Sequence, residues 1–117
     1  MNIEEYRNYC MSKKGVTESF PFDNRTLVFK VMGKMFALAD AEEFNSINLK
    51  CDPGTAIELR ERYHAVQPGY HMNKQHWNTV HVNEDASDQL IYKWIDDSYD
   101  LIAKSLTKKL RLELSQL

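Results

Sequence analysis

Apolar residues recur with a helical period at both ends of the chain. Near the N-terminus, Ile3, Tyr6 and Cys10 are separated by charged and polar residues, which predicts an amphipathic helix from Asn2 to about Lys14. From Ser87 onward the helical period continues for about five turns and predicts a long final helix. Its apolar stripe consists of Leu90, Ile91, Trp94, Ile95, Leu101, Ile102 and Leu106.

The middle of the chain shows the two-residue period of β-strands. Strands are predicted over Leu27–Met32, Met35–Ala39 and Ile47–Cys51, and Gly33 is suited to a tight hairpin turn between the first two. Asp52 followed by Pro53 predicts the start of a helix. Two further extended segments are expected, Tyr70–Met72 and Gln75–Val82, joined by a turn at Asn73-Lys74 that pairs His71 with His76 and Tyr70 with Trp77. The last segment, Lys108–Leu114, fits either a short helix or a strand.

These elements predict an α+β fold with the order α-β(3)-α-β(2)-α in one domain, residues 1–117. The predicted strands have apolar residues on one side and polar residues on the other, so we expect a two-layer structure with an antiparallel sheet and helices on one face. The core is expected to bury eight side chains almost fully: Leu27, Phe29, Val31, Leu49, Leu59, Trp94, Ile95 and Leu101. The Phe20–Arg25 segment is expected to be a connection that packs two aromatic rings against this core.

Composition narrows the functional classes. The chain has 117 residues, 43% of them hydrophobic, and a formal net charge of -2. The net charge excludes a nucleic-acid binder that works through overall charge, although a local basic patch remains possible. No run of about 18 apolar residues is present and the N-terminus is charged, so we expect a cytoplasmic protein that does not enter a membrane.

The sequence predicts no catalytic or metal site. The two cysteines, Cys10 and Cys51, fall at apolar positions and are interpreted as packing residues. His71, His76 and His81 are five residues apart, a step that alternates faces on one strand, and neither cysteine lies at a zinc-finger interval. We therefore expect no metal, no cofactor and no enzymatic activity.

Local charge indicates a candidate binding face. Lysines are expected on the uncovered side of the sheet, whereas acidic residues gather on the last helix. Amines bind phosphates, amides contact base edges and rings stack on bases. The candidate nucleic-acid-binding residues are Lys30, Lys34, Lys50, His71, Asn73, Lys74, His76, Trp77 and Asn78. The alternative is that these lysines only keep an exposed sheet face solvated.

Four segments resemble the MmcQ/YjbR family of small bacterial proteins. They are Thr26–Leu38, Leu49–Pro53, Pro68–Lys74 and His76–Val80. The block Gly-Tyr-His-Met-Asn-Lys followed by His-Trp-Asn-Thr-Val is the most specific part, and the resemblance covers nearly the whole chain. One departure is Met32 before Gly33, where two glycines are expected.

The resemblance implies a fold like that of secretion chaperones and a "double wing" DNA-binding surface. It supplies no catalytic residues. The leading hypothesis is therefore a non-enzymatic DNA-binding protein that uses a basic open sheet face and is a monomer or weak dimer. The alternative is an adaptor that binds a segment of a partner protein, as secretion chaperones do.

Overall fold

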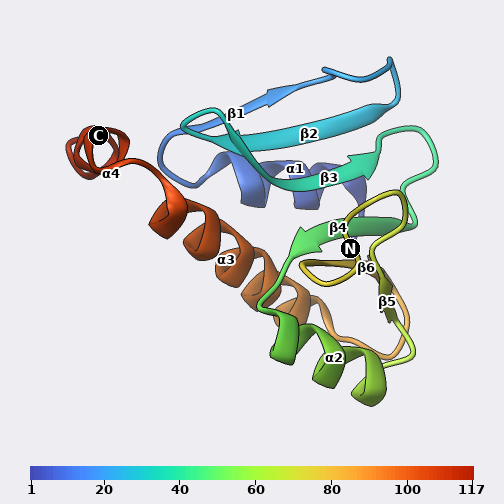
Figure 1. Ribbon diagram of the computed structural model, residues 1–117. Coiled ribbons are helices and arrows are strands. Elements are labelled where there is room, and N and C mark those ends of the chain that lie inside the picture. Colours follow the sequence, from blue (N-terminus) through green and yellow to red (C-terminus); the bar gives the residue numbers. More distant parts are fainter.

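The sheet is the central element of the computed structural model, which describes residues 1–117 (Figure 1). Its six strands all pair antiparallel with their neighbours, in the order β1-β2-β3-β4-β6-β5. The strands are β1 (Val16–Ser19), β2 (Thr26–Val31), β3 (Lys34–Asp40), β4 (Ser46–Lys50), β5 (Val66–Pro68) and β6 (Trp77–His81).

Four helices accompany the sheet: α1 (Ile3–Met11), α2 (Pro53–Arg62), α3 (Asp88–Ser105) and α4 (Lys108–Ser115). Each begins at a side chain that accepts a backbone N–H of the first turn: Asn2, Asp52, Ser87 and Thr107. In Figure 1, α4 lies beyond the end of α3, next to the loop that leads into β1, and its Leu114 packs against the core. None of the helices combines the length and apolar character that a membrane span requires.

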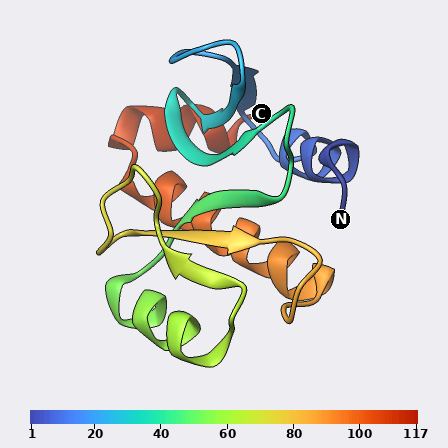
Figure 2. The ribbon, with the colours of Figure 1, turned by 90° about the vertical axis from the view of Figure 1, so that its right-hand side faces the viewer.

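One face of the sheet packs against α1 and α3. From α1, Tyr6 and Cys10 are fully buried, and Ile91 and Ile95 of α3 are fully buried as well. They meet the inward-facing residues of the strands, such as Phe29, whose ring lies edge-on to Tyr6 with centroids 5.3 Å apart. Figure 2 shows α1 and α3 beside the strands in a second view. The predicted α+β class with helices on one face is confirmed.

Several local expectations are wrong or incomplete. Strand β1 is not predicted from the sequence, because its four residues are too few to show a clear period. Of the eight expected core residues, Leu59 and Leu101 are only partly buried, because each lies at the border of its helix's apolar stripe. The open choice at residues 108–114 is resolved in favour of the helix α4.

A side chain of α3 is inserted between two central strands. The register of β3 and β4 runs from Ala39↔Ile47 to Ala37↔Leu49, and the next backbone groups in line belong to Phe36 and Lys50. The Ser98 hydroxyl lies between them: its Oγ donates to the carbonyl of Phe36 at 2.6 Å and accepts from the backbone N–H of Lys50 at 2.9 Å. Ser98 is fully buried, so this hydroxyl replaces the direct link between the strands where they separate.

Replacing Ser98 with Ala should therefore destabilise the protein by about 1–3 kcal/mol, because a carbonyl and an N–H would lose their partner away from water. Urea denaturation monitored by circular dichroism measures this difference. Ser105→Ala is the matched control on the same helix, since the Ser105 side chain is exposed: its hydroxyl donates to the carbonyl of Ile102 at 2.7 Å and accepts from Lys34 Nζ at 3.5 Å, both within reach of water. Equal losses in the two variants would contradict the role assigned to Ser98.

Candidate functional site

The side of the sheet opposite α1 and α3 is called here the open face. It is not uniformly polar, because Val28, Leu38 and Trp77 form a second buried cluster on it. Beside this cluster Thr79 Oγ1 donates to Asn48 Oδ1 at 2.5 Å across the β4–β6 pair. The open face thus has an apolar centre with a polar pair next to it.

The segment 69–76, between β5 and β6, folds back over this face. Gly69 N donates to the carbonyl of Trp77 at 2.8 Å, and Tyr70 N donates to Thr79 Oγ1 at 2.9 Å. A Cβ on Gly69 would lie 2.8 Å from both the Cβ and the carbonyl oxygen of Trp77, so only glycine allows this approach. Figure 1 shows the loop, in yellow, beside β4 and β6.

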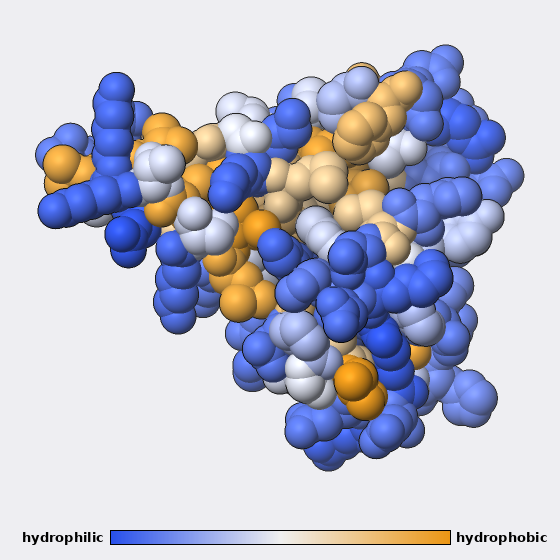
Figure 3. All heavy atoms as spheres, in the orientation of Figure 1, coloured by the Kyte–Doolittle hydropathy of each residue, from blue (hydrophilic) through white to orange (hydrophobic).

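A cleft of about 550 Å³ lies on the open face between loop 69–76 and the arm formed by residues 20–25. Two strongly exposed rings stand at its sides, Phe22 at 67% and Tyr70 at 69% exposure. Its lining contains apolar, hydroxyl, amide and carboxylate groups: Phe22, Asp23, Thr26, Met35, Leu38, Ala39, Asp40, Ser46, Asn48, Tyr70, His71, Met72 and Thr79. Figure 3 shows apolar surface over β3 that continues toward α3 on the left, with hydrophilic surface on the right.

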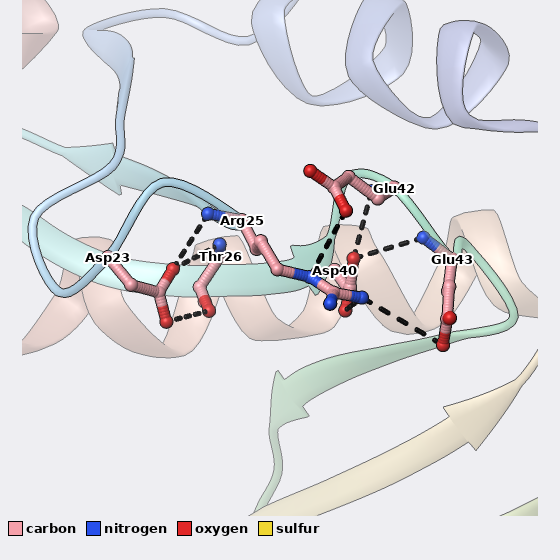
Figure 4. Close-up of polar contacts among 6 residues, drawn as sticks. All are labelled: Asp23, Arg25, Thr26, Asp40, Glu42 and Glu43. Carbon is pink, nitrogen blue, oxygen red and sulfur yellow. Dashed lines mark hydrogen bonds and ion pairs between the residues drawn. The ribbon is translucent and has the colours of Figure 1, made fainter.

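Acidic side chains hold the arm and the β3–β4 loop at one end of the cleft (Figure 4). Asp23 accepts from the backbone N–H groups of Arg25 and Thr26 at 2.9 and 2.6 Å. Asp40 accepts from the backbone N–H groups of Glu42 and Glu43 at 2.8 and 3.0 Å and from Arg25 Nη2 at 2.8 Å. Hydrogen bonds from backbone N–H groups lower the pKa of both aspartates, since they favour the charged carboxylate.

The predicted lysines do not form one continuous patch. Lys30 on β2 and Lys50 on β4 lie on the open face, near the end of the sheet opposite the aspartates. Lys34 lies near the C-terminal end of α3, where its Nζ is 3.5 Å from the carbonyl of Ser105. Lys74 donates to the carbonyl of Gly69 at 3.2 Å and so helps to close its own loop.

Two residues predicted to read bases are inaccessible. Asn78 is 2% exposed and points to the core side, where its Nδ2 donates to the carbonyl of Ala56 at 3.4 Å and its Oδ1 accepts from Arg60 Nε at 2.7 Å. Trp77 is 8% exposed under loop 69–76. The expectation that both side chains are exposed on the open face is wrong. Asn78 points to the core side of the sheet, and loop 69–76 covers Trp77.

The predicted hairpin about Asn73-Lys74 is wrong too. Strand β6 pairs with β5, residues 66–68, and not with Tyr70–Met72. Asn73 Oδ1 accepts from the backbone N–H groups of Gln75 and His76 at 2.9 and 3.3 Å, and this local turn replaces the predicted cross-strand pairing of His71 with His76. His71 is exposed and has a positive φ of 58°, and its ring centroid is 4.0 Å from that of Tyr70.

The main feature of the site, the cleft itself, is not predicted from the sequence. The Phe20–Arg25 segment was expected to pack its rings on the core, yet Phe20 and Phe22 are 48% and 67% exposed. The turn residues in this segment were the available signal, since Asp23 uses its carboxylate to shape the arm. The other wall of the cleft is loop 69–76, and its return over the sheet is visible only in the tertiary structure.

The cysteines lie away from the cleft. Burial raises the pKa of the Cys10 thiol to about 12 and that of Cys51 to about 11, so neither is poised as a thiolate at neutral pH. No group of three or more His, Cys, Asp or Glu residues is arranged to hold a metal ion.

Comparisons with known proteins identify the family. The family model described as YjbR matches residues 11–101. The uncharacterized protein YjbR of Escherichia coli strain K12 is 35% identical over 118 residues, which cover 100% of both chains. The chain belongs to the YjbR family. The Bacillus subtilis protein YyaQ, also uncharacterized, is 29% identical over 84% of this YjbR-family chain and 79% of its own.

A solved structure supports the same assignment. The crystal structure of Deinococcus radiodurans protein DR2400, which carries the family-model domain DUF419, superposes on this YjbR-family chain with a TM-score of 0.89. The two are 37% identical, and the match covers 97% of this chain and 88% of the other. The α+β fold predicted from the sequence is thus found in an experimental structure of a relative.

The acidic end of the cleft predicts a pH dependence. The pKa of Asp40 is lower in the folded chain than in the unfolded chain, so its contribution to stability is present above about pH 4 and is lost as the pH falls through the folded-state pKa. Asp40→Asn should lower the stability at pH 7, and the difference from the parent protein should shrink toward pH 3. Urea denaturation across this range tests it, with Glu61→Gln at an exposed position of α2 as control. A difference independent of pH would contradict this assignment.

Proposed function

We propose that this YjbR-family protein is a non-enzymatic DNA-binding protein that holds single-stranded DNA on its open face. The observation that carries the proposal is the cleft, which has exposed rings at its sides and polar groups on its floor. Sheet faces that bind single strands combine aromatic platforms with nearby cations. A single strand fits better than a duplex, because the lysines form no continuous basic surface.

The cleft offers contacts for one or two unstacked bases. Phe22 and Tyr70 expose the ring surface on which a base stacks. Below them, Asn48 provides an amide whose Nδ2 can hydrogen-bond a base edge, while the buried hydroxyl of Thr79 holds Asn48 Oδ1 in place. A base is flat and apolar on its faces but polar at its edges, and this cleft has the same combination.

Phosphate binding is assigned to the lysine end of the open face. Lys30 and Lys50 are the two lysines that remain on it, and neither takes part in an ion pair. The bound DNA strand would place its phosphates near these lysines and away from Asp23 and Asp40, whose negative charges lie at the other end of the face. Two phosphate contacts imply weak binding with a shallow salt dependence, in agreement with the net charge of -2.

Fluorescence anisotropy with labelled oligo-dT and with a duplex of equal length tests the proposal. The log of affinity for the single strand should fall with log salt with a slope near -1.4, taking about 0.7 per phosphate contact. Lys30→Ala should reduce this slope by about 0.7, and Tyr70→Ala should weaken binding by about tenfold through lost stacking. Lys109→Ala, at an exposed site on α4, is the matched control and should leave binding unchanged.

Two results would overturn the DNA proposal. One is the absence of binding to either DNA form below about 0.1 mM at 50 mM salt, weaker than typical non-specific binders. The other is an equal loss of affinity in Lys109→Ala and Lys30→Ala, which would show only a general charge effect. The melting temperature of each variant confirms that the exposed substitutions leave the fold intact.

A second candidate is an adaptor that binds a segment of a partner protein. It is favoured by the apolar contribution of Phe22, Met35 and Met72 to the cleft and by the acidic residues at one end, which suit a segment with an apolar and a basic side chain. Such binding depends mainly on apolar burial and should change little with salt. Salt-insensitive binding of peptides of this composition, lost in Phe22→Ala and accompanied by no DNA binding, would favour the adaptor.

A further inference from the structure

A second cavity lies on the helix side of the sheet, between α2 and α3, and the proposed function does not use it. Its volume is about 210 Å³, and we call it the α2–α3 cavity. Five hydrophobic and five polar residues line it: Leu49, Lys50, Cys51, Thr55, Leu59, Asn78, Val80, Lys93, Trp94 and Asp97.

The cavity lies beside a polar link between α2 and the sheet. Ala56 is the only buried residue of this helix, and its carbonyl accepts a hydrogen bond from the buried Asn78. Arg60 Nε in turn donates to Asn78 Oδ1 at 2.7 Å. This link holds α2 over β6, and Leu59 of the same helix is only partly buried against the core, so space remains between Leu59, Val80 and Trp94.

The chemistry of the cavity selects an uncharged apolar ligand. Its walls are aliphatic and aromatic, and apolar cavities of similar size accept a single aromatic ring in place of water. At the mouth, Lys93 Nζ and Asp97 Oδ2 form an ion pair at 3.0 Å and largely neutralise each other. Lys50, the other charged residue of the lining, pairs with Trp77 in the sheet and alternates with the inward-facing Leu49, so its side chain belongs to the open face. A charged ligand would therefore lose its hydration between Leu59, Val80 and Trp94 without a counter-charge inside the cavity.

We propose that the α2–α3 cavity is a binding site for one small uncharged molecule with a single aromatic ring. The ligand's ring packs between Leu59, Val80 and Trp94, next to the thiol of Cys51. The site is independent of the cleft, from which the sheet separates it, and binding there stabilises the position of α2 relative to α3.

Cys51 provides a built-in reporter. It is partly exposed and lines the cavity, whereas Cys10 is fully buried in the core. An alkylating reagent should therefore modify Cys51 first, and a bound ring should block it. At a ligand concentration ten times the dissociation constant, about a tenfold decrease in the alkylation rate is expected, because only the free fraction reacts.

The experiment measures alkylation of the full chain by iodoacetamide at pH 8.5 with mass spectrometry, in the presence of phenol or indole. Benzoate and benzylamine serve as charged rings of similar size. We expect the uncharged rings to slow modification of Cys51 and to raise the melting temperature, and the charged rings to do so much less. Thr55→Phe should fill the cavity mouth and abolish both effects, while Ile57→Phe, an exposed neighbour outside the cavity, should retain them.

Three outcomes would overturn the proposal. The first is the absence of protection and of a melting-temperature shift with both uncharged rings up to their solubility limits. The second is equal protection by charged and uncharged rings. The third is protection that persists in a folded Thr55→Phe variant, which would place the ligand elsewhere.

Discussion

The buried hydroxyl of Ser98 is the interaction on which the arrangement of the sheet depends. It joins α3 to both central strands, through the carbonyl of Phe36 and the backbone N–H of Lys50. Because these two groups bond to a helix and not to each other, the strands can separate at this end without leaving unsatisfied backbone groups. The apolar stripe of α3 supplies most of the burial, and Ser98 fixes where the helix sits along the strands.

One-sided packing leaves the other face of the sheet available. In many two-layer folds such a face is simply solvated, but here it has its own buried cluster under loop 69–76. Gly69 allows the loop to touch Trp77, and Asn73 and Lys74 close the loop through their own side chains. Trp77 therefore lies beneath the site, and Asn73 and Lys74 hold the loop that forms its wall. The exposed rings at the site are those of Phe22 and Tyr70.

Charge is distributed along the open face in a way that restricts its ligands. Lys30 and Lys50 lie toward one end, whereas Asp23 and Asp40 hold the other end through backbone hydrogen bonds. For the proposed single strand, this polarity requires the phosphates to lie at the lysine end and the bases over the cleft. The α2–α3 cavity on the opposite side has the Lys93–Asp97 ion pair among its lining residues, so the two proposed sites suit chemically different molecules.

The sequence by itself determined the fold class, the long final helix and the core residues of the central strands. Those features depend on the periods of apolar residues, such as Leu27, Phe29 and Val31 in β2, which local geometry converts directly into faces. The position and the lining of the site follow only from the tertiary structure. Asn78 was read on the wrong face and Tyr70–Met72 as a strand, because a loop that returns over a sheet leaves no period in the sequence. The cleft is made by segments about 50 residues apart, 20–25 and 69–76, and their contact follows from packing and not from any local pattern.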